Sequence, residues 1–453
     1  MIKLKKYYFM MRNKLFIIIL LLIISNHVFA QTNYTAIKSN GGRVDFCNQN
    51  NKIAYDRPDT NGYYNVYVTD TTGSTLINIT NKPSAPQKHN GTPAWHPNGE
   101  WIVFTSQIDS VPNYLDPICG PGIGTFNNLW ITDSVGSQFW QLTNYPYSYP
   151  AQGVLHPHFT HDGTKLYWSH LINNNLGLHG HWVLHMADFI VDVNGNPSLQ
   201  NIQTIQPAGT STFILYEPCG LSSSNDIIYF SSPMNNTSYW EWDIYSYDLN
   251  TNQLVNLTNS PGVWDEHSHV SPEGDKIVWS SSQGYTLDTT SHDSLKLDWW
   301  VMNLNGSGKT QISYFNTPGH PEYSVDRRGC SDLSFGKTGN QFYGLLQSEV
   351  AAFGSVVKVE FDVQPLSVDN IYDPDNIIIY PNPTNGILYI SSEKDYPKLD
   401  FEIFNLIGKK VKSASNVAYL DLRNLPSGAY FLRIDLTQLE NFALKLRPSK
   451  KNV

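Results

Sequence analysis

The chain has 453 residues, 13% of them aromatic, and a formal net charge of -9. This length is too great for one small domain, and the composition is that of a globular protein, which excludes a disordered chain. A nucleic-acid partner is also excluded, because phosphate binding needs a concentrated Lys/Arg surface, and no basic run follows the first few residues. The abundance of Tyr and Trp favours β structure.

Residues 1–30 have the pattern of a secretory signal peptide. A basic start precedes an unbroken apolar run over residues 15–24, and Val28, Phe29 and Ala30 occupy the positions that a signal peptidase reads. The apolar run has about half the length that spans a bilayer. We therefore predict a mature chain that starts near Gln31 and has no transmembrane segment after cleavage. A membrane anchor is the alternative.

A strand–turn–strand pattern recurs at residues 93–104, 158–168 and 269–279 and, more weakly, at 334–343. An acidic residue or Asn followed by Gly supplies the positive φ that a tight hairpin turn needs. Two further units, at residues 44–55 and 221–230, keep the same frame, and most units continue with a third and a short fourth strand. Six such units predict an all-β fold, a six-bladed β-propeller over residues 31–363. Residues 34–37 would close the last blade.

These repeats resemble those of the TolB-like propeller family, also called the PD40 repeat. The resemblance rests on Thr80, on the turns at residues 95–99 and 271–275, and on strands such as residues 128–133. It implies the fold but no single activity, because such propellers serve as protein-binding modules, sugar-processing enzymes or accessory domains.

A short polar linker, residues 364–376, separates the propeller from a different β pattern at residues 377–453. Short strands separated by Pro-Asn and Gly turns predict a small Ig-like β-sandwich. The phrase at residues 380–386, Gly408-Lys409 and the strand from Gly428 closely resemble the type A C-terminal sorting domain of the type IX secretion system of Bacteroidetes. An Ig-like binding domain with a chance motif is the alternative.

The sorting-domain resemblance implies delivery through the periplasm and across the outer membrane. Its partners would be the type IX secretion machinery and a sortase-like peptidase that removes the domain. The protein would then be released or attached to the outer-membrane surface, and we expect the mature propeller to be a monomer.

Several inner-strand positions carry residue types that commonly bind ligands or metals in proteins. When the blades are aligned on their turns, the pairs at equivalent positions are His156 and His158, Glu217 and Cys219, His267 and His269, Asp332 and Ser334, and Arg43 and Asp45. Because inner strands line the central channel, these side chains should converge near one mouth. The candidate ligand-binding residues are His156, His158, Glu217, Glu266, His267, His269 and Asp332.

The four histidines of this set are candidate metal ligands. Neutral imidazoles with carboxylates suit a divalent transition metal such as Mn, Zn, Fe or Ni, and the His-x-His spacing places both rings on one face of a strand. The phrase is similar to that of oligogalacturonate lyase, a TolB-related propeller whose metal is held by inner-strand histidines, although no matching catalytic base can be placed. The alternative is that His156, His158, His267 and His269 only hydrogen-bond to channel waters and neighbouring strands.

These observations favour an exported protein that binds a glycan or an envelope protein at the channel mouth. The rival hypothesis is a metal-dependent polysaccharide lyase or hydrolase, and a third is a protein-interaction scaffold. The four cysteines, Cys47, Cys119, Cys219 and Cys330, allow three disulfide pairings in an exported chain. A Gly-rich insertion near residues 120–124 is expected over the channel mouth, with Cys119 placed to meet Cys219.

Overall fold

The computed structural model describes residues 31–362, apart from 175–179, 208–214, 235–237, 239, 288, 290–293, 327 and 349–353. It also describes residues 378–435, apart from 381–386, 392–398, 406–408, 418 and 427–429. The predicted signal peptide and the predicted linker lie outside these residues. The described part is almost entirely β-strand and forms two compact units, a propeller and a small sandwich.

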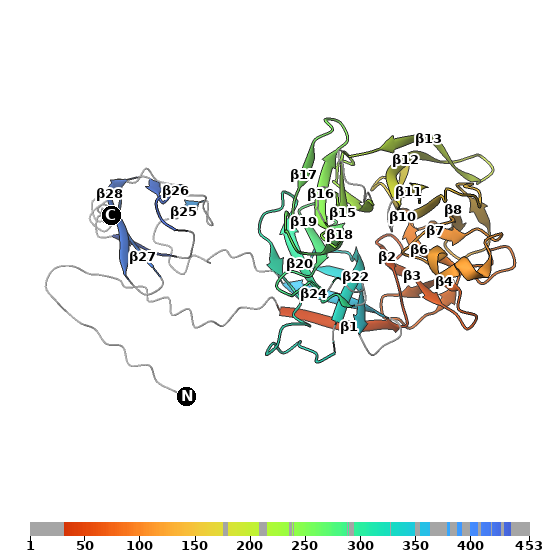
Figure 1. The fold of residues 1–453 in the computed structure, drawn as a ribbon, viewed down its shortest axis with the longest axis horizontal. Helices are drawn as coiled ribbons and strands as arrows, with labels where there is room; N and C mark the ends of the chain where they lie inside the picture. Colours follow the sequence, from red (N-terminus) through yellow and green to blue (C-terminus); the bar gives the residue numbers. More distant parts are fainter. Residues whose placement is uncertain are drawn as a thin grey trace, which may run out of the picture. The chain divides into compact units, whose positions relative to one another are not determined.

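The propeller has six blades, as the repeats predicted, and each blade is a four-stranded antiparallel sheet (Figure 1). The first blade contains β2 (Val44–Cys47), β3 (Lys52–Pro58), β4 (Tyr64–Asp70) and β5 (Ile77–Asn78). The second contains β6 (Asn90–Trp95), β7 (Trp101–Gln107), β8 (Asn127–Asp133) and β9 (Phe139–Gln141). The third contains β10 (Gly153–Phe159), β11 (Lys165–Asn173), β12 (His181–Val191) and β13 (Pro197–Ile205).

The remaining three blades complete the ring. The fourth contains β14 (Glu217–Leu221), β15 (Ile227–Ser232), β16 (Asp243–Asp248) and β17 (Leu254–Asn256). The fifth contains β18 (Asp265–Val270), β19 (Lys276–Ser281), β20 (Asp298–Asn303) and β21 (Thr310–Gln311). The sixth contains β22 (Arg328–Phe335), β23 (Gln341–Ser348), β24 (Ser355–Asp362) and, as its outer strand, β1 (Gln31–Ser39).

The sixth blade closes the ring with the first described strand of the chain. β1 pairs with β24 over eight residue pairs, from Gln31 opposite Asp362 to Ser39 opposite Ser355. Figure 1 shows β1, in red, beside the cyan strands of the sixth blade. The closing strand predicted around residues 34–37 is therefore confirmed, and it covers the outer edge of β24.

The hairpin turns that follow the inner strands of the first five blades have the expected backbone. Gly99, Gly163 and Gly274 have φ values of 75°, 71° and 66°. In the two units that lack this Gly, Asn51 and Asn225 take the position with φ values of 57° and 60°. Asn tolerates the left-handed region better than most residues, so the same turn forms without Gly.

Apolar side chains fill the spaces between successive blades. Trp168 of the third blade is fully buried and packs with Val103 and Leu129 of the second. Trp299 of the fifth blade packs in the same way against Phe342 of the sixth, with ring centroids 5.1 Å apart. Among the described residues, no helix has the length and apolarity needed to cross a membrane.

The candidate residues at the channel mouth lie near the starts of the inner strands, on one face of the propeller. The same face carries the longer loops. Because neighbouring strands are antiparallel, the start of each inner strand lies on the same face as the loop between the second and third strands. The longest of these loops, residues 108–126, contains a 3-10 helix, η1 (Asn113–Leu115), and a short helix, α1 (Asp116–Cys119). Pro121 and Gly122 of this insertion lie against Gly91 and Arg43, at the starts of two inner strands.

The second unit consists of two three-stranded sheets. One contains β25 (Ile378–Tyr380), β26 (Ile387–Ser391) and β29 (Tyr419–Asp421), and the other contains β28 (Lys410–Val417), β27 (Leu399–Phe404) and β30 (Phe431–Asp435). Leu420 of the first sheet shares a core with Phe401 and Ile403 of the second. The two sheets therefore pack face to face, as in a small β-sandwich.

Candidate functional site

All six blades contribute residues to a small cavity in the channel. They include, in blade order, Arg43, Thr92, His156, Glu217, His267 and Asp332. The cavity has a volume of about 40 Å³. That volume is enough for an ion and one or two waters, since a single water needs a cavity of at least roughly 10–15 Å³. It lies well below the roughly 300 Å³ at which small-molecule sites begin.

β-Bulges lie at four of these six residues. The ladder between the first two strands slips around Thr92 in the second blade, around His156 in the third and around His267 in the fifth. These three residues have φ values of 45°, 47° and 53°, which non-Gly residues rarely adopt. A further bulge in the sixth blade contains Asp332. Bulges re-aim side chains, and strained backbone of this kind is concentrated at functional sites.

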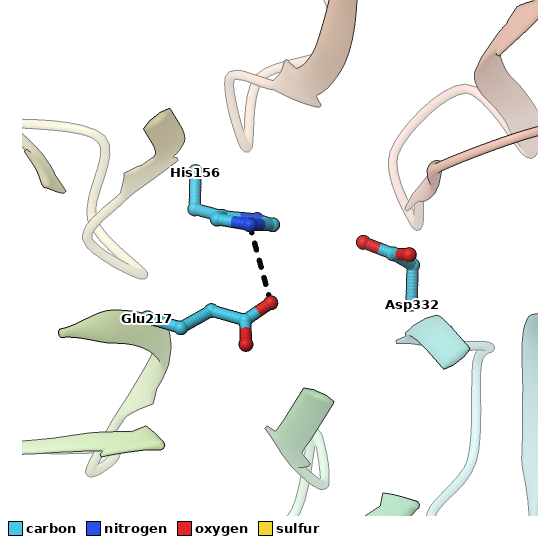
Figure 2. A group of neighbouring side chains, drawn as sticks. All are labelled: His156, Glu217 and Asp332. Carbon is cyan, nitrogen blue, oxygen red and sulfur yellow. Dashed lines mark ion pairs between the residues drawn. The ribbon is translucent and has the colours of Figure 1, made fainter. Parts of the chain in front are cut away.

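Glu217 is at the centre of the cluster. Its Oε1 lies 3.2 Å from Nε2 of His156 and 2.8 Å from Nδ1 of His267. The residue is only 4% exposed, and its Oε2 atom is buried without a hydrogen-bond partner. Figure 2 shows that His156, Glu217 and Asp332 extend toward one another from three different blades. A buried carboxylate oxygen without a partner indicates a site that a cation or water would complete.

His267 lies between carboxylates. Its Nε2 lies 3.1 Å from Oε2 of Glu266, and the same oxygen accepts a hydrogen bond of 2.8 Å from Nε1 of Trp264. Oδ1 of Asp332 lies 3.8 Å from Nδ1 of His267. Glu266 is therefore held in place by Trp264 and orients the imidazole, with Nδ1 facing Glu217 and Asp332.

Burial and charge set the protonation of this cluster. Burial alone would lower the pKa of His267, but Glu217, Glu266 and Asp332 outweigh it and hold that pKa well above 6.5. Burial also raises the pKa of Glu217 to about 7, against the lowering effect of His267. His156 is different, because burial and the neighbouring positive charges hold its pKa well below 6.5. His156 is thus neutral, and its ring can provide a lone pair.

The first two blades complete the ring of residues with an ion pair. Nη1 of Arg43 lies 3.3 Å from Oδ1 of Asp56, a fully buried residue of β3. Oδ2 of Asp56 accepts a hydrogen bond of 2.9 Å from the backbone N–H of Thr92. Alignment of the six blades on their turns placed Arg43 at an equivalent position. The predicted site nevertheless contained none of Arg43, Thr92 and Asp56. The feature that distinguishes Thr92 is its left-handed backbone, and the sequence does not reveal a backbone conformation.

The second histidine of each His-x-His pair lies against other side chains. The rings of His158 and His269 contact each other edge to face at a centroid distance of 6.1 Å, and His158 also packs against Tyr167. Burial lowers the pKa of His158 to about 3 and that of His269 to about 4, so both rings are neutral. They line the same cavity, but the groups of potential metal ligands among the described residues contain His156 and His267 instead.

The predicted pairing of Cys119 with Cys219 is wrong. Cys219 is a free, buried thiol whose Sγ donates a hydrogen bond to the carbonyl of Glu217. Cys119 lies in the insertion, buried with Val111 and Phe126. Cys47 and Cys330 are also free and buried. The thiols therefore act as small apolar side chains here.

The donor set fits a divalent transition metal. His156, Glu217 and Asp332 can each place one ligand atom within 4.8 Å of the others, and so can Glu217, Glu266 and His267. Imidazole nitrogens and carboxylate oxygens are the donors that Zn, Mn and Fe accept. The unpartnered Oε2 of Glu217 and the ion-sized cavity agree with this donor set.

Comparisons with solved structures return propellers at low similarity. TolB from Acinetobacter baumannii is 14% identical, with a TM-score of 0.42, and the alignment covers 70% of this chain but only 65% of TolB. A putative TolB from Agrobacterium tumefaciens is 12% identical, with a TM-score of 0.43 and coverage of 74% and 98%. An oligogalacturonate lyase in complex with manganese is 12% identical, with a TM-score of 0.41 and coverage of 74% and 97%. No curated protein matches the chain.

A family model matches the second unit. Residues 378–443 match the secretion system C-terminal sorting domain. Such a domain implies export and contact with the type IX secretion machinery, in agreement with the resemblance found in the sequence. The chain is thus a six-bladed β-propeller followed by a domain of the secretion system C-terminal sorting domain family.

Proposed function

We propose that the exported propeller is a binding module that holds one divalent transition metal ion in its channel cavity. The ligands would be Nε2 of His156, Nδ1 of His267 and carboxylate oxygens of Glu217 and Asp332. The observation that carries this proposal is the position of Glu217, which shares one group of potential ligands with His156 and Asp332 and a second group with His267. At the channel mouth, the site would bind a donor group of a glycan or an envelope protein.

The residues around His267 support this assignment. A histidine that binds a metal through one ring nitrogen commonly donates its other N–H to a carboxylate, which fixes the tautomer and the ring orientation. Nε2 of His267 faces Glu266 in this way, and Trp264 holds Glu266. A purely structural ion pair between His267 and Glu217 would not require Glu266 as well.

The size of the cavity limits what can enter it. A volume of about 40 Å³ excludes a whole sugar ring, so an extracellular ligand would insert only a protruding carboxylate or hydroxyl. A bound metal would attract such a group as a Lewis acid. Arg43 also lines the cavity, but its charge is balanced by the buried Asp56, so a bound metal would be the main attraction for an anionic group.

A metal-dependent polysaccharide lyase or hydrolase is the second candidate function. It is favoured by the pKa of Glu217, which is about 7 and therefore suits a general base at neutral pH. Glu217 would then have to remain free of the metal. The two candidates differ in turnover, because the binding module does not convert its ligand.

Metal analysis of the purified full chain tests the proposal. After chelation and reloading with Mn²⁺ or Zn²⁺, the protein should contain about one metal ion per chain, and His267→Ala and Glu217→Gln should lose it. His181→Ala is the matched control, because His181 lies on β12 of the third blade and bonds only Gln206 among its described polar contacts. Wild-type protein that takes up no metal would overturn the proposal. Turnover of a uronate-containing polysaccharide that depends on Glu217 would favour the enzyme.

A further inference from the structure

Three tyrosines form an aromatic surface on the face of the propeller where the channel site lies. Tyr114 comes from the insertion between β7 and β8, and Tyr147 and Tyr149 come from the loop between β9 and β10. Tyr114 is 79% exposed and Tyr149 is 63% exposed. Exposed aromatic groups of this kind on a soluble protein commonly mark a binding site.

The platform, defined as Tyr114, Tyr147 and Tyr149, is held by packing beneath it. The buried ring of Phe126 contacts Tyr147 and Tyr149 edge to face, with centroid distances of 5.0 and 5.4 Å. The ring centroids of Tyr147 and Tyr149 are 6.4 Å apart, and burial together with the neighbouring Tyr114 raises the pKa of Tyr147. Phe126 itself has a φ of 56°, so strained backbone supports this arrangement. The rings are thus already ordered, which lowers the entropic cost of binding a ligand.

The insertion connects the platform with the channel mouth. Tyr114 begins the segment whose later residues, Pro121 and Gly122, lie against Gly91 and Arg43. Lys88 fixes the same segment, because its Nζ donates to the carbonyl of Val111. An extended ligand on the platform would therefore lie along the insertion that leads to the cavity.

We infer that this platform binds a neutral polysaccharide chain. Tyrosine rings offer apolar faces and uncharged hydroxyls, which match the apolar faces and hydroxyl rims of sugar rings. The four large apolar side chains exposed here, Tyr114, Ile118, Ile123 and Tyr149, are too few to form the apolar centre of a stable protein interface. An anionic membrane or polymer would need basic groups, whereas the ammonium of Lys88 is already occupied and the chain is acidic.

Affinity electrophoresis of the full chain tests this inference. Gels containing hydroxyethylcellulose, xyloglucan, galactomannan or xylan should retard the wild-type protein. Tyr114→Ala and Tyr149→Ala should each weaken retardation by about tenfold in apparent Kd, whereas Tyr149→Phe should bind nearly as well. Both residues are exposed, so the alanine variants should keep the fold. Tyr323→Ala is the control, because Tyr323 is a 40% exposed tyrosine in the loop between β21 and β22.

The other outcomes would overturn the inference. They are no retardation in any of the four gels, equal retardation of the alanine variants, and equal loss with Tyr323→Ala. Loss of binding after chelation with EDTA would assign the ligand to the channel instead, since the platform contains no metal donor. A dimer that Tyr149→Ala dissociates would show that a second copy of the chain covers the platform. Failure of metal binding alone would leave the platform intact, so the two proposals fail independently.

Discussion

Raising the pH from 6 to 8 should tighten the binding of Mn²⁺ to the channel site by about a thousandfold, of which about a hundredfold comes from His267. Carboxylates around His267 hold its pKa well above 6.5, so without metal the ring carries both protons at neutral pH. A metal on Nδ1 must displace one of them. Each proton released makes the Kd about tenfold tighter per pH unit, or about 1.4 kcal/mol.

Glu217 increases this dependence on the acidic side. Its pKa is raised to about 7, so below pH 7 a second proton must leave before the carboxylate can bind a cation. The slope of log Kd against pH should therefore approach two below pH 7 and one above it. Isothermal titration calorimetry in two buffers with different ionisation enthalpies would count the protons directly.

The variant Glu266→Gln provides the matched test of the cause. The amide preserves the shape of the side chain but removes a negative charge from a position 3.1 Å from Nε2 of His267. The pKa of His267 should fall, and the slope between pH 7 and 8 should become smaller. A Kd that is unchanged within twofold from pH 6 to 8, with no proton release, would refute the assignment of His267 as a protonated ligand.

Three further predictions concern the propeller itself. Thiol reagents should label Cys47, Cys219 and Cys330 only after denaturation, as seen by mass spectrometry of labelled peptides, because all three are buried and free; a disulfide at any of them would contradict the structure. Tyr34→Ala should lower the free energy of unfolding in urea by about 2 kcal/mol, because the closing strand loses its ring contacts with the fifth blade. Trp168→Ala should cost about 4 kcal/mol, since this side chain is fully buried between blades, and a change below 1 kcal/mol would contradict that packing.

Much of the fold could be predicted because its signals are local. The turns need a residue with positive φ, and Gly or Asn at residues such as Gly99 and Asn225 reveals them directly. Alternation of apolar and polar residues then marks the strands, and six repeats give six blades. The position of β1 followed from counting, because the last unit has three strands and a ring requires a fourth.

The details of the site could not be predicted, because they depend on pairing between strands. Simple alternation places the two histidines of His-x-His on one face, but the bulge at His156 gives this residue a left-handed backbone and a partner in the neighbouring blade. Thr92 has the same backbone without a side chain that suggests a ligand. The carboxylate of Asp56 comes from a second strand, and no sequence spacing connects it with Thr92.

The sixth blade has a consequence for how this cargo matures. Its third strand, β24, ends at Asp362, and its outer strand, β1, begins at Gln31. The ring is therefore closed by pairing between two segments that are more than three hundred residues apart in the chain. The toroid can be completed only when both segments have reached the same compartment. Cleavage after Asp362 would release the sorting domain without opening the ring, whereas removal of β1 would leave β24 without its outer partner strand.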